Sequence, residues 1–63
     1  MCEANVYIEK DGKEELYFES VYLLKPEGDQ ILMVNIFGEQ RIIRARFLRL
    51  DLAKEKIVLK PEP

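Results

Sequence analysis

Short apolar runs separated by turn-forming groups are the feature that most limits the folds open to this chain. The runs are rich in Val, Ile, Leu, Tyr and Phe, residue types that favour strands. The spacing predicts antiparallel strands over residues 2–10, 14–25, 30–37, 40–51 and 55–60. The groups between them are Asp11-Gly12, Pro26-Glu27-Gly28-Asp29, Phe37-Gly38-Glu39 and Ala53-Lys54-Glu55. Asp11-Gly12 and Gly38 can supply the positive φ angles of tight turns.

Side-chain alternation predicts a bulge in each of the two longest strands. The apolar positions change phase from Leu16 and Phe18 to Val21 and Leu23, and from Ile43, Ala45 and Phe47 to Leu48, Leu50 and Leu52. A bulge inserts one residue and bends the strand, so a small sheet can curl over onto itself. We therefore expect an all-β fold, a five-stranded antiparallel SH3-like barrel, partly open, with residues 1–63 as one domain. The predicted core includes Val6, Ile8, Leu16, Phe18, Ile43, Phe47 and Leu50.

The chain is so short that its own core should give it only marginal stability. A domain of 63 residues buries only about 60% of the surface that its unfolded chain exposes, and such domains usually need a disulfide, a metal or a partner subunit. Cys2 is the only cysteine, which excludes an intrachain disulfide. Residues 31–37 are apolar on both faces apart from Asn35, so we expect a second copy to cover one face in a homodimer. Either strand 31–37 or the first strand should lie near the seam, with Asn35 hydrogen-bonded there.

Composition excludes several classes of function. The chain has no His, one Ser and no Thr, so it cannot assemble a Ser/His/Asp or Cys/His catalytic centre. A net charge of −2 argues against a dedicated nucleic-acid binder. Without such a centre we expect no enzyme activity. We expect a cytoplasmic protein, because its first residues contain acids and no apolar run, and no stretch of the sequence is long enough to span a membrane.

Cys2 is the first candidate for a site. It could simply be a small buried residue at the start of a strand. A lone thiol near a chain end in the cytoplasm is also a usable metal ligand, and thiolate with nitrogen donors suits Ni(II), Zn(II) or Cu(I). One cysteine cannot fill four positions, whereas two chains would bring two thiolates together. The main-chain nitrogen of Cys2 or Glu3 could add donors, as could the α-amine of Cys2 if Met1 were removed.

The arginines form the second candidate. All four lie in the predicted strand 40–51: Arg41, Arg44, Arg46 and Arg49. With Tyr7, Tyr17 or Tyr22 nearby, such a strand could hold single-stranded RNA by charge and stacking. The alternative is a solvated strand whose charges face Glu9, Glu15 and Glu19 across the sheet. The net negative charge favours this alternative.

The sequence resembles the CooT family of small nickel-binding accessory proteins. The resemblance rests on Met1-Cys2-Glu3-Ala4-Asn5-Val6-Tyr7, Glu15-Leu16, Glu19-Ser20-Val21, Asn35-Ile36-Phe37-Gly38-Glu39, Arg49-Leu50-Asp51-Leu52 and Lys56-Ile57-Val58-Leu59. It implies an SH3-like homodimer that binds one Ni(II) through Cys2 and acts as a metallochaperone for carbon monoxide dehydrogenase. Proteins of this kind have also been labelled predicted RNA-binding proteins, which keeps the RNA alternative in view.

Overall fold

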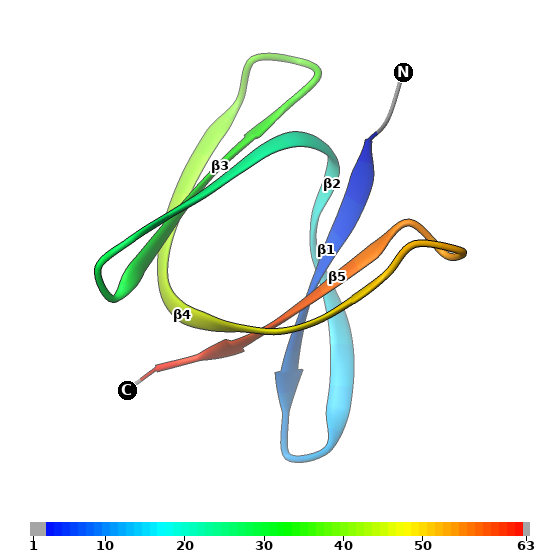
Figure 1. The fold of residues 1–63 in the computed structure, drawn as a ribbon, viewed down its shortest axis with the longest axis vertical. Helices are drawn as coiled ribbons and strands as arrows, with labels where there is room; N and C mark the ends of the chain where they lie inside the picture. Colours follow the sequence, from blue (N-terminus) through cyan, green and yellow to red (C-terminus); the bar gives the residue numbers. More distant parts are fainter. Residues whose placement is uncertain (1–2, 63) are drawn as a thin grey trace.

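Five strands form a closed ring in the computed structural model, which describes residues 3–62. The strands are β1 (Ala4–Lys10), β2 (Lys13–Glu27), β3 (Gln30–Asn35), β4 (Gln40–Asp51) and β5 (Lys56–Pro61). Consecutive strands pair antiparallel, and β1 closes the ring by pairing in parallel with β5 (Figure 1). The all-β prediction is confirmed and the arrangement is consistent with an SH3-like barrel. The barrel is closed, however, and not partly open, because β5 returns alongside β1.

The predicted turns occur where the sequence placed them. Asp11 and Gly12 have φ angles of 51° and 77° and join β1 to β2 in a two-residue hairpin. Two successive positive φ angles match the right-handed twist of the flanking strands. Gly38, with φ 82°, lies in the turn between β3 and β4. No helix in residues 3–62 has the length and apolar character needed to cross a membrane.

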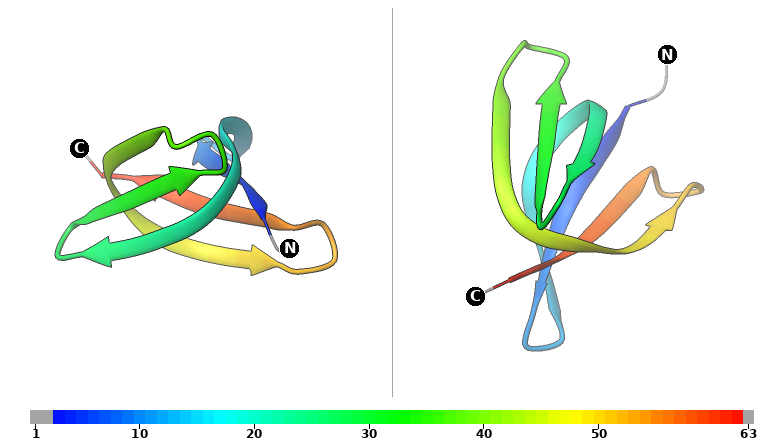
Figure 2. Two further views of the ribbon diagram at one scale, coloured as in Figure 1. Left: turned by 90° about the horizontal axis from the view of Figure 1, so that it is seen from above. Right: turned by 60° about the vertical axis from the view of Figure 1, so that its left-hand side comes forward.

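Both predicted bulges are present, and each lets one long strand pair with two neighbours. In β2 the register shifts between Phe18 and Val21, where Ser20 has a positive φ of 57°. In β4 it shifts between Phe47 and Arg49. The first part of β2 pairs with β1 and its last part with β3, while β4 pairs first with β3 and then with β5. The bends of β2 and β4 that close the ring are visible in Figure 2.

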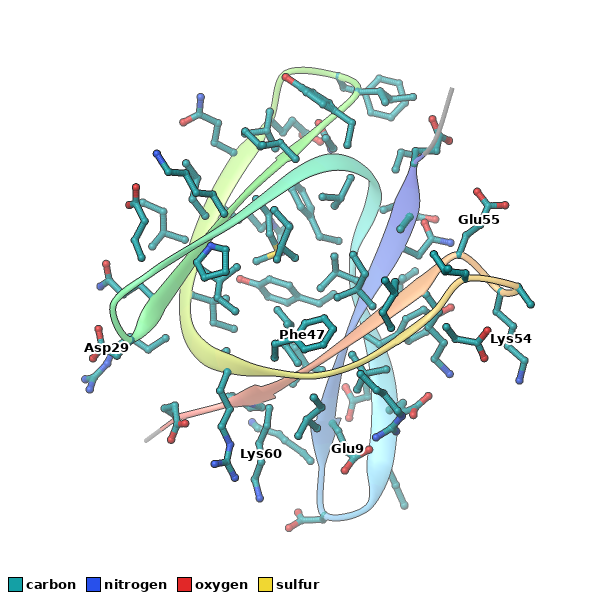
Figure 3. The ribbon with its side chains drawn as sticks, in the orientation of Figure 1. Glu9, Asp29, Phe47, Lys54, Glu55 and Lys60 are labelled. Carbon is teal, nitrogen blue, oxygen red and sulfur yellow. The ribbon has the colours of Figure 1, made fainter. Side chains whose placement is uncertain are left out.

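The core differs in its members from the one that the alternation predicted. It consists of Val6, Phe18, Val21, Ile31, Met33, Ala45 and Leu59, with Ile43 packed against it. The predicted core positions Leu16, Phe47 and Leu50 were wrong, since these side chains are 50%, 50% and 49% exposed. Phe47 points into the space between β2 and β4 (Figure 3), two strands that do not pair with each other, so no strand covers it. Leu16 lies in the part of β2 that extends beyond its pairing with β3.

The strand that was expected to need a second copy is covered by its own chain. Ile31, Met33 and Val34 are all buried, and so is Asn35. Only Ile36 and Phe37, which follow β3, are exposed, at 44% and 75%. Within residues 31–37, the exposed apolar side chains are therefore at the turn after β3 and not on the strand itself.

A charge network ties the β1–β2 hairpin to β4 and β5. Arg49 of β4 lies 2.6 Å from a Glu9 carboxylate oxygen and also contacts Glu14. Lys56 of β5 contacts Glu14 and lies 4.8 Å from the centre of the Tyr7 ring. Hydrogen bonds from Lys56 and then Arg49 lower the pKa of the Glu14 carboxyl below its ordinary value.

This network predicts that Glu14 makes stability depend on pH. A carboxyl whose pKa is lower in the folded state stabilises the fold above its unfolded pKa, and the contribution is lost as pH falls through the folded value. We expect Glu14→Gln to lower the melting temperature near neutral pH. The variant should also lose less stability than the parent between about pH 5 and about pH 3. Thermal denaturation across that range tests this, and parallel curves for the two proteins would contradict it.

Candidate functional site

The start of β1 is fixed immediately after the candidate ligand. Cys2 lies outside the described residues, and Glu3, which is partly buried, is the first residue that the structure describes. Asn5 forms two hydrogen bonds to other parts of the chain: its backbone amide donates to the Glu55 carbonyl at 2.9 Å, and its side-chain Oδ1 accepts from the Ser20 amide at 3.2 Å. Asn5 is thus joined both to β2 and to the turn between β4 and β5.

An apolar groove of about 510 Å³ lies beside this end of β1, and we call it the N-terminal groove. It is lined by Glu3, Ala4, Val21, Tyr22, Leu23, Leu24, Leu50, Leu52, Glu55 and Ile57. Leu52, on its β4 side, is 79% exposed. The sequence analysis missed this groove, although the run of three apolar residues after Val21 is a signal that could have pointed to it.

The described part of the chain offers no metal site of its own. Among residues 3–62, no three His, Cys, Asp or Glu side chains lie close enough together to hold a metal ion. The thioether of Met33 is fully buried in the core. A metal bound by this protein would therefore need ligands from the N-terminal residues, from another molecule, or from both.

Three of the four arginines are paired with carboxylates. Arg44 lies 3.1 Å from Asp29, Arg46 lies 3.8 Å from Glu62, and Arg49 bridges Glu9 and Glu14. Of the predicted acidic partners Glu9, Glu15 and Glu19, only Glu9 forms such an ion pair within residues 3–62. These pairs are exposed and contribute little to stability individually, yet they offset positive charge that a phosphate backbone would require.

Arg41 differs from the other three. Its guanidinium carbon lies 5.0 Å from the centre of the Tyr17 ring and 4.7 Å from that of Phe18, and it donates a hydrogen bond to the Tyr17 carbonyl at 3.2 Å. It forms no ion pair within residues 3–62. Tyr17 is thus covered by Arg41, and Tyr7 by Lys56, so the structure does not assemble a row of open aromatic rings along the arginine strand.

Asn35 organises the turn between β3 and β4. Its Oδ1 accepts from the amides of Phe37 (3.1 Å) and Glu39 (2.9 Å), and its Nδ2 donates to a Glu39 carboxylate oxygen at 2.7 Å. Its own amide donates to the Glu39 carbonyl. Asn35 is therefore hydrogen-bonded within its own chain, and its expected place at a dimer seam stays a prediction.

Comparison with known proteins assigns this architecture to a family. Residues 1–60 match the family described as CO dehydrogenase accessory protein CooT. The chain belongs to the CooT family. A crystal structure attributed to CooT from Carboxydothermus hydrogenoformans is 40% identical and covers 98% of this chain and 100% of its own, with a TM-score of 0.90. An uncharacterised protein of Methanocaldococcus jannaschii is 27% identical over 59 residues, 94% of this chain and 96% of the relative.

The family assignment fixes the general role. CooT proteins are accessory proteins of CO dehydrogenase, so this chain is an accessory protein and not an enzyme. An accessory role implies a partner enzyme, such as CO dehydrogenase.

The Asn35 network predicts a rigid turn. Asn35→Ala should lower the free energy of unfolding by about 1–3 kcal/mol, because two partly buried backbone amides and one carboxylate lose a hydrogen-bond partner. It should also increase amide hydrogen exchange at Phe37 and Glu39. Asn35→Asp combined with Glu39→Gln is the matched control, since it keeps an acceptor oxygen for both amides and lets the side-chain amide introduced at position 39 donate to it, so protection at both amides should be preserved. Unchanged exchange in Asn35→Ala would show that the backbone alone holds the turn.

Proposed function

We propose that this protein is a Ni(II)-binding accessory protein that holds the metal through the Cys2 thiolate and buffers it or delivers it to a nickel enzyme such as CO dehydrogenase. The observation that carries the proposal is the match to the CooT family over residues 1–60, which includes Cys2. The proposal places the protein in the cytoplasm, where thiols stay reduced.

The composition of the chain supports Cys2 as the ligand. Thiolate is a soft donor that binds Ni(II) well, and the chain contains no His to compete with it. The other sulfur atoms belong to Met1 and Met33, whose thioethers suit Cu(I) better, and Met33 is fully buried. Main-chain nitrogens of Cys2 or Glu3 are suitable additional donors.

A single chain leaves the coordination incomplete, and this supports a homodimer. One thiolate fills one of the four positions of a square-planar site, whereas two chains supply two thiolates and two nitrogen donors. The start of β1 is anchored through Asn5, and the N-terminal groove beside it provides exposed apolar surface for a second molecule. The first strand is therefore a better candidate for the seam than the strand 31–37.

Titration of Ni(II) into the parent protein and Cys2→Ser tests the proposal. Absorbance in the thiolate-to-nickel charge-transfer region should saturate at half a metal ion per chain in the parent. Cys2→Ser keeps the side-chain shape and should fold normally, yet bind nickel about a hundredfold more weakly or worse, since loss of supporting contacts alone costs 10–100-fold. Affinity should also fall as pH drops below neutral, because binding deprotonates the thiol. Equally tight binding by Cys2→Ser would refute the proposal.

RNA binding through Arg41, Arg44, Arg46 and Arg49 is the weaker alternative. Three of these side chains already face carboxylates, and the chain carries a net charge of −2. We expect Arg44→Glu combined with Arg46→Glu to leave nickel binding unchanged, and we expect the parent to show no tight RNA complex at physiological salt. Fluorescence anisotropy with an unstructured RNA measures this. A sub-micromolar complex that weakens steeply with salt would favour the alternative.

A further inference from the structure

The first half of β2 has an open edge. Residues 13–21 pair with β1, whereas pairing with β3 begins only at Val21. On the side away from β1, residues 13–19 therefore have no partner strand within the part of the chain that the structure describes. The β1–β2 hairpin also projects beyond the rest of the ring (Figure 1). An open edge presents main-chain amides and carbonyls that can pair with a strand of another molecule.

The charges along this edge leave a gap. Residues 13–15 and Glu19 are charged, whereas residues 16–18 are Leu, Tyr and Phe. Leu16 is half exposed, so apolar surface lies beside the open main chain. Charged side chains protect a strand edge because pairing would remove them from water, and an uncharged stretch of strand-forming residues lacks this protection. The gap is therefore the part of the edge most open to pairing.

Arg41 of β4 reaches into this gap from another strand. The turn after β3 is joined to β2 by a main-chain hydrogen bond, from the Ile36 amide to the Ser20 carbonyl at 2.9 Å. Three residues further toward the start of β2, the Arg41 guanidinium donates a hydrogen bond to the Tyr17 carbonyl at 3.2 Å. A side chain thus occupies a main-chain acceptor that a neighbouring strand could otherwise use.

The guanidinium is held over the gap by the two rings on either side of it. Its central carbon lies 5.0 Å from the centre of the Tyr17 ring and 4.7 Å from that of Phe18. Arg41 forms no ion pair within residues 3–62, unlike the other arginines of β4. Its contacts are with the edge itself, and its charge lies where residues 16–18 have none.

We propose that Arg41 closes the open edge of β2 against pairing with the same edge of another copy of this chain. A strand that lay along residues 16–18 would have to displace the guanidinium from the Tyr17 carbonyl and desolvate its charge. Without Arg41, two identical edges can pair antiparallel about a two-fold axis. Neither Cys2 nor nickel takes part, so this role is independent of the proposed function.

Sedimentation velocity of metal-free Arg41→Ala and of the parent tests the proposal. We expect the variant to reach a weight-average mass about twice that of the parent or more, because each open edge recruits another. Arg44→Ala is the matched control: it removes the same side chain from the same strand, but Arg44 pairs with the Asp29 carboxylate at 3.1 Å. This control should sediment as the parent does.

Amide hydrogen exchange identifies the surface that associates. If the edges pair, exchange at residues 14–18 of Arg41→Ala slows as the protein concentration rises. If Arg41 only packs on the rings, its removal speeds exchange there at every concentration. Arg41→Ala combined with Leu16→Lys puts a charge back on the edge and should return to the mass of the parent.

Several outcomes would overturn the proposal. They are a parent-like mass for Arg41→Ala, association that protects residues outside 13–19, and association that persists in the variant with Leu16→Lys. Circular dichroism shows whether each variant is folded. If Arg41→Ala is not, Arg41→Gln takes its place in the same comparisons, since it removes the charge with a smaller loss of packing, and a parent-like mass there overturns the proposal equally.

Discussion

The hydrogen bonds around Ser20 join the start of β1, the bulge of β2 and the turn after β3. At this bulge β2 leaves β1 and joins β3, with the Ser20 backbone at a φ of 57°. The Ser20 amide bonds to the Asn5 side chain and its carbonyl to the Ile36 amide. Ser20 therefore links β1, the bend that closes the barrel and the turn that carries the exposed Ile36 and Phe37. Removing the bulge would flip the side chains of one half of β2 to the other face.

The small size of the barrel explains why so much apolar surface remains outside. Two bent strands and three shorter ones enclose a core of seven buried residues, with a few side chains packed against it. Where β2 and β4 run past each other without pairing, no second layer exists to cover the inner face. Side chains such as Phe47 and Leu50 are left open there. For a chain of this length, association with a second molecule is a reasonable way to bury that surface.

Local pattern was sufficient to predict the strands, the turns and the two bulges. The alternation around Phe18–Val21 and Phe47–Leu50 reports directly on backbone register, which is why these predictions were confirmed. The exposure of Leu16, Phe47 and Leu50 depends on which strands fail to pair, a property of the closed ring that no local pattern contains. The partners of Asn35 and of the arginines depend on loop geometry in the same way. The N-terminal groove is lined by residues of β2 and of the end of β4, which lie more than twenty residues apart in the sequence, so no local pattern predicts the complete groove.

Cys2 could be recognised as a candidate from its position and its chemistry, and the family match extends over it. The central claim is that one nickel ion is shared by the Cys2 thiolates of two chains. X-ray absorption spectroscopy of the nickel-loaded protein tests this most directly, because it counts the sulfur neighbours of the metal. We expect two sulfur atoms and two nitrogen or oxygen atoms in a four-coordinate, square-planar site. A nickel ion surrounded by six nitrogen or oxygen atoms and no sulfur would contradict it.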